Sequence, residues 1–134
     1  MFIINGLQDD LLNFLKKRIP DHMPFDYKDF TKESIIYGCY KEDVLIGIIR
    51  TRLPVSGGLF IAWMVIDKDH RGKGYGSRFY KKAEWLLKAD LDVFIVILSV
   101  MKDNPKALAF WKKMGFKEDT EEEEEDDFLL MKFI

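Results

Sequence analysis

The sequence predicts one domain of the α/β (α+β) class, with a mixed central β-sheet and helices on both faces. Two observations carry this prediction. Segments 59–66 and 93–100 are almost wholly apolar, as in buried strands, and the amphipathic segment 75–87 between them predicts the helix of a β-α-β unit. The chain of 134 residues is 48% apolar, which suffices for one core over residues 1–134 and argues against disorder.

The N-terminal segment predicts a short strand followed by a helix. Residues 2–5 can form the strand. Residues 9–18 carry leucines at helical spacing, basic residues suit the last turn, and Pro20 ends the helix. Residues 21–30 predict a loop or a broken helix.

The next elements predict a β-hairpin and a central strand. Residues 34–40 and 44–52 should pair around a turn at Glu42 and Asp43, and residues 54–58 should form a loop. Cys39 falls in an apolar strand pattern, which predicts a buried structural thiol. Segment 59–66 is too apolar for a half-exposed strand, so it should be central.

The remaining elements follow the predicted helix at 75–87. Segment 93–100 should be a strand buried on both sides. A helix is expected over residues 105–114, and two strands, at 116–119 and 128–133, should flank an acidic run.

The turn Arg71-Gly72-Lys73-Gly74-Tyr75-Gly76 joins the central strand to the following helix. Glycines allow a diphosphate to approach the backbone closely, and the amides of a helix N-terminus and two cations attract it. A P-loop does not fit, because no Gly-Lys-Ser/Thr follows a glycine at the required spacing. A dinucleotide fingerprint does not fit either, because its third glycine is missing.

A second segment, residues 104–116, has its own local signals. Asn104 can cap a helix, Pro105 suits the first helical position, and Gly115 can take the left-handed position at its end. The apolar side chains between them recur at helical spacing.

The two segments together resemble the GNAT superfamily (Gcn5-related N-acetyltransferases). Arg71, Gly74 and Gly76 match the acyl-CoA loop Arg/Gln-x-x-Gly-x-Gly/Ala, and residues 104–116 match Asn-x-x-Ala-x-x-Phe-Tyr-x-x-x-Gly-Phe. The resemblance implies the GNAT fold and transfer of an acetyl group from acetyl-CoA, as cosubstrate, to a primary amine. It implies no metal. The cofactor-binding residues that it implies are Met64, Val65, Ile66, Arg71, Gly72, Lys73, Gly74, Tyr75, Gly76, Ser77 and Asn104.

The catalytic positions depart from the family pattern. Trp111 stands where the family usually has a tyrosine that protonates the departing thiolate, so it could hydrogen-bond the sulfur or simply pack. Many relatives have a glutamate in the strand before the glycine loop, but the matching positions here, Phe60, Ala62 and Met64, cannot ionise. The base therefore stays unknown. Asp21, Asp26, Glu33 and His22 lie in the region that borders the acceptor site in this family, and His70 is expected to shape the turn.

The charge distribution bears on the acceptor. Segment 118–127 holds nine acidic residues, and without them the net charge of −2 would become +7. In this family the segment joining the last two strands often lines the acceptor cleft, so the run could attract a cationic small-molecule or peptide amine, or it could be a solvated loop. No nucleic-acid-binding signature occurs.

The remaining expectations concern location and alternatives. No apolar run is long enough to span a membrane, no signal peptide is evident, and a single cysteine suits the cytoplasm. The sequence allows a homodimer. A GNAT module that binds acyl-CoA without turnover, or an interaction protein that uses the acidic run, remain alternatives to an enzyme.

Overall fold

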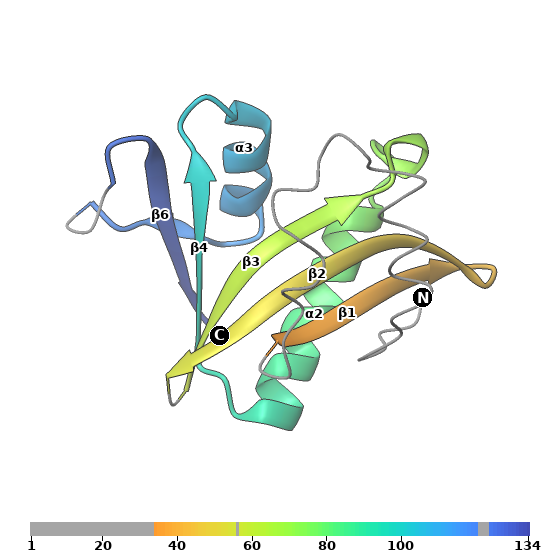
Figure 1. Ribbon diagram of the computed structural model, residues 1–134, viewed down its shortest axis with the longest axis horizontal. Coiled ribbons are helices and arrows are strands. Elements are labelled where there is room, and N and C mark those ends of the chain that lie inside the picture. Colours follow the sequence, from red (N-terminus) through yellow and green to blue (C-terminus); the bar gives the residue numbers. More distant parts are fainter. Residues whose placement is uncertain (1–33, 56, 121–123) are drawn as a thin grey trace.

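The computed structural model describes residues 34–55, 57–120 and 124–134, which form a mixed six-stranded sheet and two α-helices (Figure 1). The order across the sheet is β1-β2-β3-β4-β6-β5, and the predicted α/β class with a mixed central sheet is confirmed. Both described helices pack into one core on the same face, so helices on both faces stay a prediction. The strand expected at 2–5, the helix at 9–18 and the segment 21–30 lie outside the described residues. The elements are β1 (Ser34–Lys41), β2 (Val44–Val55), β3 (Gly58–Ile66), the 3-10 turn η2 (Lys68–His70), α2 (Tyr75–Leu91), β4 (Ile95–Met101), α3 (Pro105–Lys113), β5 (Lys117–Glu118) and β6 (Asp127–Phe133).

Strands β1 and β2 form the predicted hairpin. Glu42 and Asp43 both have positive φ, 50° and 68°, and a two-residue turn of this kind matches the twist of the strands that it joins. The loop expected over 54–58 is wrong at both ends, because β2 continues to Val55 and β3 begins at Gly58. The described β1–β2 pairing runs from Lys41 and Val44 to Ser34 and Arg52.

Strand β3 lies between β2 and β4, as expected for a central strand, and it runs parallel to β4. The prediction that β4 is buried on both sides is wrong. Val96, Leu98 and Val100 are buried, but Ser99 and Met101, which alternate with them, are exposed. The physical reason is that Ser99 and Met101 point to the face of β4 opposite α2 and α3, and that β4 pairs with β3 only as far as Ile97.

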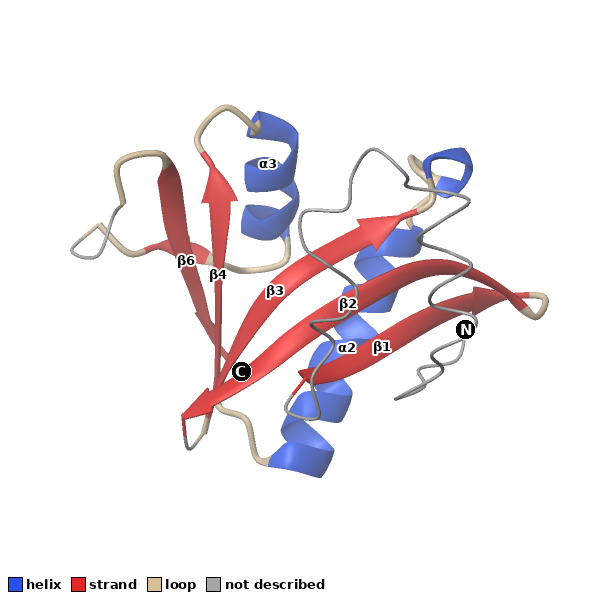
Figure 2. Ribbon diagram, in the orientation of Figure 1, coloured by secondary structure: helices blue, strands red, loops and turns tan. Residues whose placement is uncertain are grey.

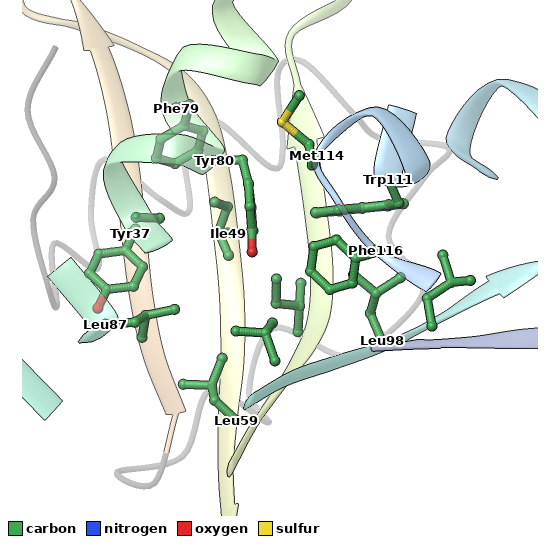
Figure 3. Close-up of a cluster of buried hydrophobic side chains, with 14 of the residues drawn as sticks. Tyr37, Ile49, Leu59, Phe79, Tyr80, Leu87, Leu98, Trp111, Met114 and Phe116 are labelled. Carbon is green, nitrogen blue, oxygen red and sulfur yellow. The ribbon is translucent and has the colours of Figure 1, made fainter. Parts of the chain in front are cut away.

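Both described helices contribute to one core against the sheet (Figures 2 and 3). Phe79, Tyr80, Ala83 and Leu87 enter it from α2 and Trp111 from α3. Cys39 is fully buried in the same core, as predicted, and burial raises the pKa of its thiol to about 11. Neither α2 nor α3 combines the length and apolar character that crossing a membrane requires.

Candidate active site

A β-bulge in β3 opens the sheet beside β4. Trp63 pairs with Arg50 and Ile61 with Thr51, so Ala62 is an extra residue on β3. A bulge shifts the alternation of side chains and bends the strand. The core side chains are accordingly Leu59 and Ile61 before it, but Met64 and Ile66 after it.

The pairing of β3 with β4 ends where the bulge begins. Its last pair is Phe60 with Ile97, and Figure 1 shows the two strands diverging from there. Strand β4 instead keeps β6 as its partner along residues 95–101. Beyond Phe60, the backbone groups on the edge of β3 that faces β4 are therefore not paired with any strand in the described part of the chain.

A cleft of about 620 Å³ lies between the two strands. Its walls come from β3, β4 and α3, and they are mostly apolar. Arg71 is the only charged residue among the described residues that line the cleft. The lining residues are Ile61, Ala62, Trp63, Met64, Val65, Arg71, Leu98, Ser99, Val100, Met101, Asn104, Ala107 and Trp111.

The glycine turn adjoins the cleft at the C-terminal end of β3. Gly72 and Gly74 have φ of 74° and 83°, and a Cβ on either would meet nothing within 4 Å. Gly74 is the N-cap of α2, and the first helical bond runs from the Arg78 amide to the Gly74 carbonyl at 3.2 Å. The amides of residues 75–77 therefore lack an acceptor within the helix, and the space beside the glycines is open.

Hydrogen bonds hold the turn against the end of β3. The Arg71 Nε donates to the Ile66 carbonyl at 2.7 Å, and the Lys73 Nζ donates to the Asp69 carbonyl at 3.4 Å. In η2, the His70 Nδ1 lies 3.2 Å from the Oδ2 of the buried Asp67, so His70 shapes the turn as expected. These contacts hold the turn in one conformation beside the cleft.

Helix α3 closes the other side of the cleft. The Asn104 Oδ1 accepts a hydrogen bond from the Ala107 amide at 3.2 Å, and Gly115 ends the helix with φ of 99°. Both were predicted. Asn104 therefore caps α3 while it also lines the cleft.

Trp111 is held in the core by aromatic neighbours. Only 8% of it is exposed, and its ring makes edge contacts with Tyr80 at 5.2 Å and Phe116 at 5.2 Å (Figure 3). The Tyr80 hydroxyl donates to Glu84 at 3.2 Å, and Lys132 pairs with Glu84 at 2.5 Å. Burial, with the Glu84 charge next, raises the pKa of Tyr80. Of the two roles considered for Trp111, the contacts favour packing.

The structure brings together part of the predicted site. Met64, Val65, Arg71, Asn104 and Trp111 line the cleft, whereas the Ile66 side chain enters the core. Residues 72–77 form the adjoining turn and the first turn of α2. The acid-base candidates Asp21, His22, Asp26 and Glu33 lie outside the described residues.

Sequence reasoning missed the cleft wall on the side of the sheet opposite α2 and α3. Trp63, Ser99 and Met101 belong to it. Ser99 carried one signal, since it is the only polar side chain in the predicted strand 93–100. The described parts of the acidic run, 118–120 and 124–127, do not line the cleft, although Asp127 pairs with Met101.

The fold and the cleft can now be compared with known proteins. A family model described as "Acetyltransferase (GNAT) family" matches residues 4–116. The chain belongs to the GNAT family. No curated protein sequence matches it.

Solved structures of other GNAT-fold proteins have the same architecture at low identity. The ribosomal-protein-S18-alanine N-acetyltransferase from Escherichia coli has a TM-score of 0.80 and 17% identity, with 98% of this chain and 92% of that chain covered. The Campylobacter jejuni N-acetyltransferase PseH in complex with acetyl coenzyme A has a TM-score of 0.72 and 16% identity, with 98% and 96% covered. The PaiA N-acetyltransferase of Thermoplasma acidophilum in complex with coenzyme A has a TM-score of 0.69 and 20% identity. The match covers 76% of this GNAT chain, and this chain spans 62% of the length of the PaiA chain.

Proposed function

We propose that this GNAT chain is an N-acetyltransferase that moves an acetyl group from acetyl-CoA to a primary amine. The observation that carries the proposal is the cleft between β3 and β4, which Arg71 at the start of the glycine turn lines. The relatives crystallised with coenzyme A or acetyl-CoA support the choice of donor. We propose further that the chain acts as a single domain, and its single cysteine suits the cytoplasm.

The diphosphate of the donor would lie at the glycine turn. The amides of residues 72–77, with Arg71 and Lys73, supply donors and positive charge there, and the open space beside Gly72 and Gly74 leaves room for phosphate oxygens. The pantetheine arm would then extend along the free edge of β3 at residues 64–66 and pair with its backbone like an added strand.

The transfer itself needs no covalent intermediate on the protein. The amine nitrogen attacks the thioester carbonyl carbon, the carbon–sulfur bond breaks, the amine loses a proton and the thiolate gains one. An alkylamine with the pKa of lysine is neutral in about one molecule in two thousand at pH 7, so deprotonation weighs heavily on the rate. The buried Trp111 cannot deliver a proton, but a thiol of pKa ~8.5 is a tolerable leaving group without an acid.

A second function is an acyl-CoA-binding module without turnover. Trp111 in place of tyrosine, and a described cleft wall without a carboxylate, favour this alternative. Release of free thiol from acetyl-CoA with a panel of amines separates the two functions. The enzyme predicts amine-dependent release and a raised melting temperature with acetyl-CoA, whereas the module predicts only the second. A protein that binds partners through the acidic run predicts neither.

A further inference from the structure

We propose that the acceptor is a monoamine with an apolar or aromatic group next to its amine, bound by Trp63, Ser99 and Met101. These three residues form what we call the outer wall of the cleft. The inference rests on the proposed acetyl transfer and deepens it, since it names the class of amine.

The alternation of side chains places the outer wall opposite the helices. On β4, Leu98 and Val100 enter the core beneath α2 and α3, so Ser99 and Met101 point to the other face of the sheet. On β3, Met64 and Ile66 pack toward the core after the bulge, so Trp63 points away from it. All three outer-wall residues line the cleft.

Residues that point to both faces of the sheet therefore line the cleft. Arg71, Asn104 and Trp111 line it near the helices, where the glycine turn would hold the donor. The outer wall lines it from the other face. A donor that enters from the helix side leaves the thioester carbonyl accessible to an amine that arrives along the outer wall.

The chemistry of the outer wall selects the acceptor. Trp63 and Met101 are apolar residues that line the cleft, and Met101 is 59% exposed, so the outer wall offers apolar surface to a ligand. The exposed Ser99 hydroxyl can accept a hydrogen bond from the attacking amine. In the described part of the wall no carboxylate offers a counter-charge for a second ammonium group, which disfavours diamines and polyamines.

The test compares 2-phenylethylamine with 1,4-diaminobutane as acceptors for the full chain, with acetyl-CoA as donor. We expect kcat/KM to be at least about tenfold higher for 2-phenylethylamine, the usual scale of discrimination by an apolar pocket. The substitution Trp63→Ala should remove most of this difference and leave the Kd for acetyl-CoA unchanged. The matched control is Trp85→Ala on α2, a tryptophan 59% exposed and outside the cleft, which should preserve the preference.

A charge substitution provides a second arm that does not depend on removing a large side chain. Met101→Glu, at an exposed site, should shift the kcat/KM ratio toward 1,4-diaminobutane by about fivefold, as expected for one partly exposed ion pair. Ser99→Ala should lower kcat without raising the KM for acetyl-CoA. Ser99→Thr, which keeps a hydroxyl at this position, should restore kcat.

The outcomes separate the two proposals. A wild-type preference for 1,4-diaminobutane, or an unchanged amine ratio in both Trp63→Ala and Met101→Glu, overturns the outer-wall inference while acetyl transfer stands. If no amine releases thiol, the proposed function fails and the inference with it.

Discussion

The Arg71 Nε donates a hydrogen bond to the Ile66 carbonyl over 2.7 Å, and this bond joins the start of the glycine turn to the last residue of β3. It directs one donor of the guanidinium toward the protein. Arg71 also lines the cleft, and its planar guanidinium fork has further N–H donors besides Nε. One side chain thus orients the turn and brings a positive charge to the cleft.

Removing this charge should weaken donor binding. We expect Arg71→Ala to raise the Kd for acetyl-CoA by roughly 10- to 100-fold, the scale of one charge-assisted hydrogen bond to phosphate. Arg71→Lys should fall between Ala and wild type, because it keeps the charge but loses the fork. Isothermal titration calorimetry measures this, with Lys81→Ala on the exposed face of α2 as the matched control. Equal Kd values for Arg71→Ala and Lys81→Ala would exclude a role for Arg71 in binding.

The glycines of the turn should differ in what they tolerate. Gly74→Ala must adopt φ near 83° and should lower the free energy of unfolding by about 1–2 kcal/mol. Gly76→Ala brings its Cβ only into ordinary contact, 3.5 Å from Phe110, and should be neutral or stabilising by about 0.5 kcal/mol. Urea unfolding of the pair distinguishes them, and stability changes of the same sign and size would contradict the described turn.

The helix caps and the hairpin turn could be predicted from the sequence because each depends on residues that are close together in the chain. The Asn104 cap and the Gly115 terminus each follow from one residue type at one position. The turn at Glu42 and Asp43 likewise needs only its position between two strand patterns.

The shape of the cleft could not be predicted in this way. The bulge at Ala62 lies in an apolar strand, where side chains on both faces look alike, so the change in alternation leaves no pattern in the sequence. The exposure of Ser99 and Met101 depends on how far β3 departs from β4, which is a tertiary property. The apolar character of segment 93–100 therefore predicted two buried faces where β4 has one.

Replacement of Trp111 by tyrosine should not abolish catalysis. We expect Trp111→Tyr to change the rate of acetyl transfer by less than about 100-fold, because the tryptophan packs against Tyr80 and Phe116 and supplies no proton. The smaller ring should destabilise the fold by about 1–2 kcal/mol through the space it leaves. Steady-state kinetics and thermal melts check both effects, and complete loss of activity in a folded variant would refute the packing role.

The buried thiol of Cys39 should make stability fall at alkaline pH. Folding raises the pKa of the Cys39 thiol from 9.0 to about 11. The contribution of the buried neutral thiol to the free energy of unfolding is therefore fully present below pH 9. It is lost as the pH rises toward 11, because ionisation of the thiol favours the unfolded chain. The stability advantage of wild type over Cys39→Ala should therefore shrink by about 2 kcal/mol between pH 8 and pH 11. Urea unfolding at both pH values measures this difference. A constant difference would mean that the thiol is not buried.

The most direct test of acetyl transfer is to count both products in one reaction. Purified protein is incubated with acetyl-CoA and 2-phenylethylamine, free thiol is titrated, and the N-acetylated amine is quantified by mass spectrometry. Acetyl transfer by this chain predicts the two products in equal amounts, increasing with time and absent without the amine or without the protein. Thiol release without an acetylated amine, or no release across the whole amine panel, would contradict it.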